Sequence, residues 1–261
     1  MIGRTIAVVA AVLGAGTARA AENPTIVLVH GAFETAEVWK PVEARLHADG
    51  YRTLAVTLPG RPGYLLPAGQ ATLDLYRETV LKTLVGETRP VVLVGHSFGG
   101  VTISSVGEAA PAKIRTLVYV AAFLPATGQS LLALSKADPG SKMGPAFRVS
   151  ADKTAASIDP AVRGELFCNG CDAKVQAAVA AGIVDEPLSP LATPVTLTAD
   201  RFGKLDKVYV HTARDVVVTP ALQAAMVAAT PVRRELTVDA GHAAFAAAPV
   251  DLAKAIEAAA Q

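Results

Sequence analysis

The sequence predicts an α/β fold: a mostly parallel sheet of about six strands, helices on both faces, and an inserted helical cap. Continuous apolar runs such as residues 26–30 alternate with helix-length segments, which is typical of parallel strands buried on both faces. One of these runs ends in a Gly-x-Ser-x-Gly turn. Between about residues 124 and 194 the alternation stops, and short helical pieces are broken by Pro and Gly. Such an insertion suits a cap above the carboxyl ends of the strands.

The first half of the chain contains three strand–helix pairs and a fourth strand. Gly50 ends the first helix, and the Pro- and Gly-rich residues 61–69 are expected to be a loop. The predicted strands cover 26–30, 53–58, a run that starts at 91 and enters the turn, and 114–123, and the predicted helices cover 36–49, 72–85 and 101–108.

After the cap the regular alternation resumes. The run 195–198 is the first clean strand pattern there, followed by strands at 207–212 and 233–238. Helices are expected at 220–229, which has proline in its first turn, and at 249–260. Residues 21–261 therefore form one domain with an insertion.

The amino terminus is predicted to be a signal peptide covering residues 1–20. A short basic start with Arg4 precedes the apolar run 6–16, and Ala18-Arg19-Ala20 has the small residues that signal peptidase reads. The apolar run is about half the length of a membrane-spanning helix, which makes a retained anchor the weaker alternative. We expect a mature protein that begins at Ala21 and is periplasmic or secreted, with no membrane partner after cleavage.

Charge and cysteine content limit which binding partners and metal or redox sites are expected. Arg4 and Arg19 leave with the signal peptide, so 22 of the 24 basic residues remain against 23 acidic ones. Without a basic patch, nucleic acid is not an expected partner. Both cysteines lie in Cys168-Asn169-Gly170-Cys171, too few for a zinc site, and a local disulfide is expected in an oxidising compartment. A redox-active pair is the alternative. No metal is expected.

Ser97 is the predicted nucleophile. It lies in Gly95-His96-Ser97-Phe98-Gly99, where an apolar run meets a helix pattern, as in a nucleophile elbow. Side chains at Gly95 and Gly99 would collide where the turn is tightest. The pentapeptide alone is also compatible with an ordinary Gly-Ser turn, so the assignment depends on a base and an acid downstream.

His242 and Asp215 are the predicted base and acid. Serine needs a base, the base needs an acid partner, and on this scaffold the chain order is Ser, Asp or Glu, His. His242 follows the last strand, whereas His211 lies inside a strand and suits a structural role. Asp215 follows the strand 207–212, which places it at the carboxyl edge of the sheet. The other candidate acids are Asp239, close to His242 in the chain, and Asp200 and Asp206, which precede that strand.

The oxyanion donors are expected to be two backbone N–H groups. One belongs to Phe98, which follows the nucleophile, and the other to Ala32, in the loop after the first strand. His96 is expected to pack or hydrogen bond beneath the nucleophile. The cap offers apolar side chains that could line a pocket or form the cap's own core: Leu131, Leu132, Leu134, Phe147 and Phe167.

These motifs resemble the α/β-hydrolase superfamily, and more narrowly the branch of plant methylesterases, hydroxynitrile lyases and bacterial esterases. The resemblance is carried by residues 28–32, 95–100, 209–215 and 241–242 and covers nearly all of the chain after Pro24. It implies the same triad and oxyanion hole and no cofactor. Hydroxynitrile lyases of this branch have a lysine directly after the histidine, where this chain has Ala243. Glu34 and Glu37 stand where the plant proteins have a histidine and a tryptophan, which places plant hormone substrates in doubt.

The expected function is therefore that of a serine esterase acting on a small or medium ester, as a monomer or homodimer. A ligand-binding or sensor protein on a hydrolase scaffold is the alternative from another class. A lactonase, haloperoxidase or lyase activity on the same triad is also open, because one scaffold hosts many reactions.

Overall fold

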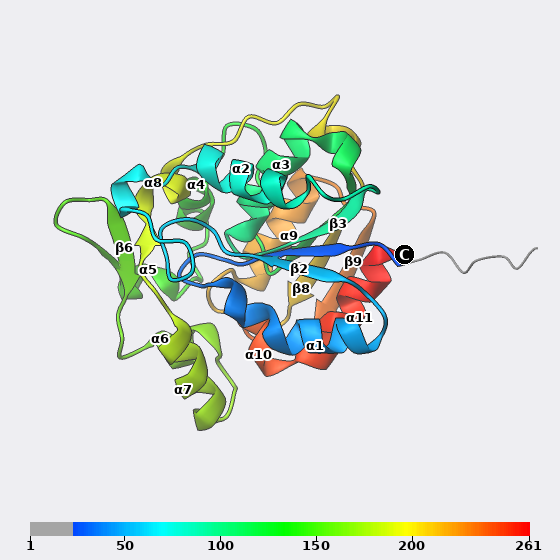
Figure 1. The fold of residues 1–261 in the computed structure, drawn as a ribbon. Helices are drawn as coiled ribbons and strands as arrows, with labels where there is room; N and C mark the ends of the chain where they lie inside the picture. Colours follow the sequence, from blue (N-terminus) through cyan, green and yellow to red (C-terminus); the bar gives the residue numbers. More distant parts are fainter. Residues whose placement is uncertain (1–22) are drawn as a thin grey trace, which may run out of the picture.

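The structure is a computed structural model, which describes residues 23–261. The predicted signal peptide lies outside these residues. The central sheet is entirely parallel, with strand order β2-β1-β3-β4-β8-β9 (Figure 1). The six strands are β1 (Ile26–Val29), β2 (Thr53–Val56), β3 (Val91–His96), β4 (Ile114–Val120), β8 (Lys207–Thr212) and β9 (Arg234–Val238). The predicted sheet of about six strands is confirmed.

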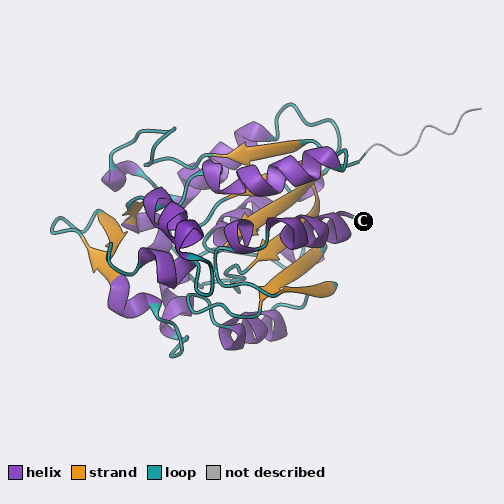
Figure 2. Cartoon of the chain, turned by 90° about the horizontal axis from the view of Figure 1, so that it is seen from below, coloured by secondary structure: helices purple, strands orange, loops and turns teal. Residues whose placement is uncertain are grey.

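Helices cover both faces of the sheet (Figures 1 and 2). On one face lie α1 (Lys40–Ala48) and α11 (Pro249–Ala260), with the short α10 (Ala244–Ala247) beside them. The opposite face carries α2 (Leu73–Thr83), α3 (Gly99–Ala109) and α9 (Pro220–Ala229). Short 3-10 helices add η1 (Ala36–Trp39), η2 (Ala68–Gln70), η3 (Pro111–Lys113) and η4 (Phe202–Lys204).

Local sequence explains why these elements begin and end as they do. Thr72 and Thr219 cap α2 and α9, each accepting a backbone N–H three residues on. Pro220 occupies the first position of α9, where its missing N–H costs nothing. Gly50, with φ of +84°, ends the segment after α1 in the left-handed region that glycine favours.

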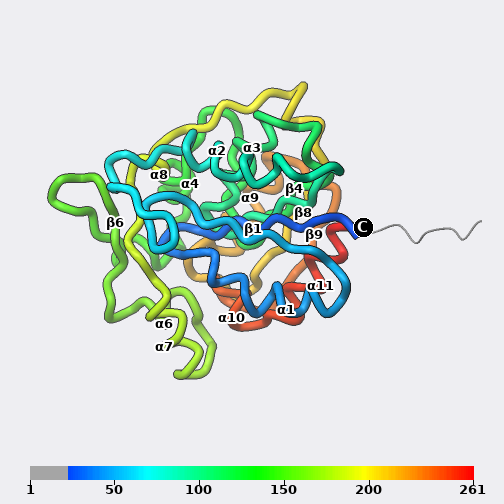
Figure 3. The backbone as a smooth tube through the Cα atoms, in the orientation of Figure 1, coloured from blue at the N-terminus to red at the C-terminus, as the bar shows by residue number. Residues whose placement is uncertain are grey.

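A cap lies beyond the carboxyl ends of the strands, on the left of Figure 3. The chain enters it after β4 and returns to the sheet at β8. Its helices are α4 (Leu131–Lys136), α5 (Met143–Ala146), α6 (Arg163–Phe167), α7 (Ala173–Gly182) and α8 (Leu188–Ala192). All lie within the predicted insertion. The cap also contains an antiparallel sheet that the sequence pattern did not predict: β5 (Phe147–Val149), β6 (Ala155–Ile158) and β7 (Glu186–Pro187).

The prediction of a strand at residues 195–198 is wrong. Val195 and Leu197 do carry buried or half-buried side chains, which produced the apolar pattern. Their backbone N–H groups, however, donate to Gln129 O and Thr127 Oγ1 rather than to a neighbouring strand. The segment is therefore an extended connection between the cap and the sheet.

Candidate active site

Ser97 occupies a strained turn between β3 and α3. Its φ is +51°, in the left-handed region that few non-glycine residues adopt. A Cβ on Gly95 would lie 2.6 Å from the backbone of Gly99, and one on Gly99 would lie 2.6 Å from Val29 O. Both positions are therefore restricted to glycine by close approach of the backbone. The geometry is that of the predicted elbow.

His242 and Asp215 lie together, both buried. His242 Nδ1 is 2.8 Å from Asp215 Oδ2, and Thr212 Oγ1 donates to the same oxygen. The other oxygen, Oδ1, accepts the N–H groups of Val217 and Val218 at 2.8 and 3.0 Å. A carboxylate that is fixed on both oxygens accepts a hydrogen bond from Nδ1–H, so the lone pair of the neutral His242 ring is left on Nε2.

The structure does not join Ser97 to His242 by a hydrogen bond. His242 Nε2 is buried and has no hydrogen-bond partner among residues 23–261. Such contacts are often long or poorly aligned in free enzymes and tighten when substrate binds. The structure thus pairs the predicted acid, Asp215, with the predicted base, His242. It leaves Nε2 of His242 without a partner and therefore available to accept a proton from Ser97.

The other candidates from the sequence have different partners. Asp239 pairs with Arg214 at 2.8 Å, and Asp206 binds Arg233 and Thr116. Asp200 pairs with Lys204 at the surface, and His211 lies between Gln223 and Glu235. None of these side chains forms a hydrogen bond or ion pair with His242 in the part of the chain that the structure describes.

Two backbone donors flank Ser97. Ala32 lies in the turn after β1 and Phe98 follows the serine, and neither N–H donates a hydrogen bond to another described residue. Both residues are buried. Free N–H groups in an apolar environment are costly unless a ligand oxygen accepts from them. They are therefore suited to bind a carbonyl oxygen that gains negative charge.

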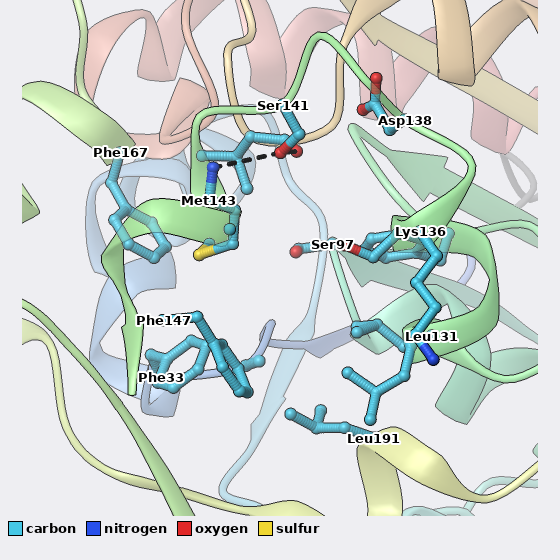
Figure 4. Close-up of a pocket in the computed structure, with 16 residues that line it drawn as sticks. Phe33, Ser97, Leu131, Lys136, Asp138, Ser141, Met143, Phe147, Phe167 and Leu191 are labelled. Carbon is cyan, nitrogen blue, oxygen red and sulfur yellow. Dashed lines mark hydrogen bonds between the residues drawn. The ribbon is translucent and has the colours of Figure 1, made fainter. Parts of the chain in front are cut away.

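Ser97 lies at the base of a cavity of about 390 Å³ under the cap. Figure 4 shows Phe33 and Phe147 on one side, edge to face with ring centroids 6.1 Å apart, and Leu131 and Leu191 on another. Leu132, Phe167 and Met143 also line it, whereas Leu134 does not. The sequence left open whether the five cap residues line a pocket or form the cap core; four of them line this cavity, and Leu134 is buried elsewhere in the cap.

Polar groups at this cavity are few. Both oxygens of Asp138 are engaged by Thr219, its N–H at 2.9 Å and its hydroxyl at 2.6 Å. Ser141 Oγ donates to Val217 O and accepts from Met143 N, the contact drawn in Figure 4. Lys136 is exposed. The wall near Ser97 is therefore largely apolar, which favours an uncharged ligand.

A buried ion pair anchors the cap to the loop after β2, and sequence reasoning missed it. Arg61 Nη1 and Nη2 each bind Glu186 of β7 at 2.9 Å, and both side chains are 0% exposed. Burial alone would lower the pKa of Arg61, but Glu186 and Tyr76 outweigh it and raise that pKa above its usual range.

The same Glu186 holds the backbone next to Ala32. Its Oε2 accepts the N–H of Phe33 at 2.9 Å, while Phe33 O accepts the N–H of Val184. Phe33 has φ of +64°, a left-handed conformation that costs about 1 kcal/mol or more unless its surroundings hold it. The cap therefore fixes the shape of the loop that carries the Ala32 donor.

The predicted disulfide is present in the structure, and it closes a loop against the base. Cys168 and Cys171 are joined with Cα atoms 5.5 Å apart. Asn169 Nδ2 donates to Arg214 O at 2.7 Å, next to Asp215, and Phe167 O accepts the N–H of Ala243 at 2.7 Å. The loop thus contacts the residues beside both the acid and the base.

His96 lies beneath the nucleophile, as expected, and hydrogen bonds to Glu34, whose role the sequence did not reveal. The only sign in the sequence that Glu34 is special is that it stands where the plant methylesterases have a histidine. His30 is also structural: its Nδ1 binds Gly31 O and its Nε2 accepts from Leu58 N. Burial and the nearby Arg61 lower the pKa of His30 to about 3, so it stays neutral.

Between residues 23 and 261 no group of three or more His, Cys, Asp or Glu side chains could hold a metal ion. Over the same range, no helix is long and apolar enough to cross a membrane.

Comparison with known proteins gives the family. Residues 26–255 match the model of the alpha/beta hydrolase family. A putative chloroplastic methylesterase of Arabidopsis thaliana is 28% identical over 89% of this chain, which spans 63% of that protein's length. A carbendazim hydrolyzing esterase of a Nocardioides species is 39% identical over 41% of this chain and 46% of its own.

A solved structure agrees with the fold. The pyrethroid hydrolase of Sphingobium faniae is 25% identical, with a TM-score of 0.78, covering 91% of this chain and 97% of that one. The resemblance to plant methylesterases and bacterial esterases is thereby confirmed. Since the family match extends over most of the chain, the protein belongs to the alpha/beta hydrolase family.

Proposed function

We propose that the protein is a serine esterase that hydrolyses small or medium uncharged carboxylic esters through an acyl-enzyme. One observation carries the proposal: Ser97 lies at the base of an apolar cavity beside two unengaged N–H donors and a buried Asp215–His242 pair. The names of the relatives support it, since they include a methylesterase and an esterase.

In the acylation step His242 Nε2 takes the proton of Ser97 while Oγ bonds to the ester carbonyl carbon. The carbonyl oxygen becomes negative and accepts the N–H groups of Ala32 and Phe98. Collapse of this intermediate breaks the bond to the alkoxy oxygen, which leaves as the alcohol with the proton from His242. Asp215 stabilises the positive imidazole throughout.

Deacylation repeats the sequence with water as the nucleophile. His242 takes a proton from water as its oxygen bonds to the acyl carbon, and then returns that proton to Ser97 as the acid leaves. The four hydrogen bonds that fix the Asp215 carboxylate keep the acid in place for both steps.

The cavity supports an apolar acyl or aryl group as substrate. A volume of about 390 Å³ is at the small end of ligand pockets, which suits a medium-sized ester. Four aromatic residues line it, and rings stack well on other rings: Phe33, Phe123, Phe147 and Phe167. Ala243 is buried and supplies no cation near the base, which argues against cyanohydrin cleavage.

The test is hydrolysis of p-nitrophenyl esters of graded chain length by Ser97→Ala beside the wild type. The variant should lose about 10⁴-fold or more in kcat, as removal of a serine nucleophile does in other hydrolases. Ser135→Ala is the control, because Ser135 lines the same cavity and has no part in the mechanism. Wild-type turnover in Ser97→Ala would contradict the proposal.

The same panel separates the alternatives. Saturable binding of esters without hydrolysis would identify a ligand-binding protein on a hydrolase scaffold. Turnover of a lactone or a cyanohydrin in preference to every ester would identify another reaction on the same residues.

We also propose that the mature protein begins at Ala21 and acts in the periplasm or medium. The Cys168–Cys171 disulfide supports this, because disulfides persist in oxidising compartments. Amino-terminal sequencing of protein recovered from periplasm and medium tests it, and an intact Met1 in all fractions would contradict it.

A further inference from the structure

Glu34 and His96 form a buried pair directly beneath the elbow. Glu34 Oε2 is 3.0 Å from His96 Nδ1, and the two side chains are 2% and 0% exposed. The same Oε2 accepts the N–H of Gly31 at 2.7 Å. Gly31 immediately precedes Ala32, so this one oxygen holds the start of the loop that carries an oxyanion donor.

The other ring nitrogen of His96 reaches the base. Its Nε2 is 3.0 Å from the backbone oxygen of His242. A carbonyl oxygen only accepts hydrogen bonds, and so does an ionised carboxylate. When Glu34 is ionised, His96 has an acceptor at each ring nitrogen and donates from both, which makes it an imidazolium.

The surrounding electrostatics agree with that protonation state. Burial would lower the pKa of His96, but the Glu34 carboxylate beside it outweighs this and raises it. Burial would raise the pKa of Glu34, but His96 outweighs this and lowers it. The other titratable groups near His96 are His242, Asp215 and His30.

We propose that Glu34 and His96 are a carboxylate–imidazolium pair that acts by positioning other residues. The pair fixes the loop after β1, which carries the Ala32 donor, relative to the base His242. The inference rests on the proposed esterase function. Glu34 Oε2 fixes the loop at Gly31, and His96 Nε2 fixes the loop at His242. Through this pair, two loops that are more than 200 residues apart in the chain are held by a single hydrogen-bonded chain of atoms.

Glu34 also balances charge beside the base. The His96 and His242 rings tilt against each other with centroids 4.6 Å apart. A lone imidazolium at that distance would oppose protonation of His242 during acylation. Because Glu34 neutralises His96, the charge that develops on His242 meets an overall neutral pair on one side and Asp215 on the other.

Glu34→Gln is the most informative variant, because neither atom of the amide can replace Oε2 in its contacts with both His96 and Gly31. With the amide oxygen there, a neutral His96 donates from Nδ1, and the lone pair of Nε2 then faces His242 O. With the amide nitrogen there, the N–H of Gly31 faces another donor. Either way, one of the two loops loses its anchor.

We expect Glu34→Gln to lower kcat about 10- to 100-fold with KM changed less than about threefold, since misplacement of catalytic groups affects the reaction more than binding. The matched control is Glu37→Gln, which removes the charge of an exposed glutamate in the same segment; among residues 23–261 this glutamate forms an ion pair only with Lys40. Ser97→Ala is assayed alongside, so failure of the esterase mechanism itself would be seen separately.

A second measurement needs no turnover. Nitrogen-15 NMR of wild-type protein with labelled histidine should show one buried ring with both nitrogens protonated at neutral pH, and this signature should disappear in Glu34→Gln. A singly protonated His96 in the wild type, with the proton on Glu34, would overturn the proposal. So would a Glu34→Gln enzyme with unchanged kcat.

Discussion

Replacing Glu186 with glutamine tests how the cap is fastened to the sheet. In the wild type its two oxygens accept from Arg61 Nη1, Arg61 Nη2, Tyr76 and the N–H of Phe33, at 2.9 to 3.0 Å. A glutamine offers one oxygen, and its amide nitrogen would face the donors of Arg61. The Arg61 charge would then be buried without a counter-charge.

The expected loss of stability follows from the burial of the Arg61 charge. Removing one partner of a buried ion pair costs about 3–5 kcal/mol, because the remaining charge stays desolvated. For a domain of this size each 1 kcal/mol lowers the melting temperature by about 2–4 °C. The variant should therefore melt about 6–20 °C below the wild type, and kcat should also fall because the weakened cap contact holds the loop at Phe33 less firmly.

Thermal unfolding followed by circular dichroism measures this shift. Asp200→Asn is the control, since its pair with Lys204 is exposed and its loss should change the melting temperature by about 1 °C or less. The double variant Arg61→Met/Glu186→Leu should regain much of the loss, because it leaves no unpaired charge. A Glu186→Gln protein that melts within about 2 °C of the wild type would refute the reasoning.

Two further predictions concern pH and redox state. The folded pKa of His30, about 3, lies below the ordinary 6.5, so the stability it contributes is complete above pH 6.5 and lost as the pH falls towards 3. Urea titrations should show the wild type losing about 1.4 kcal/mol more per pH unit than His30→Gln below pH 6; parallel curves would contradict this. Reduction of the Cys168–Cys171 disulfide should lower kcat about tenfold, since its loop contacts the backbone beside Asp215 and His242. The Cys168→Ser/Cys171→Ser variant should show that loss without reductant and no further loss with it.

The elements that the sequence predicted well have strong local signals. The strand Lys207–Thr212 and the helix Pro220–Ala229 have the predicted bounds, one from a continuous apolar run and the other from proline at its first turn. The candidate site residues were predicted from chain order and strand ends, since the fold brings the carboxyl ends of parallel strands together.

What the sequence could not predict depends on distant partners. The short strands β5, β6 and β7 pair across gaps of up to about 30 residues, which no local pattern records. Glu34 and Glu186 look like ordinary surface glutamates in the sequence, yet both are buried by contacts with His96 and Arg61. In each case tertiary structure, not residue type, determines the environment.

The left-handed Phe33 limits how this protein can be redesigned. If the cap were a separable module, exchanging it alone would change the lining of the cavity and leave the sheet and its loops unaltered. Here the cap supplies the acceptor for the Phe33 N–H, the donor for its carbonyl and the counter-charge for Arg61. A transplanted cap would have to bring an acidic residue equivalent to Glu186, or the recipient would lose its oxyanion geometry along with its old specificity.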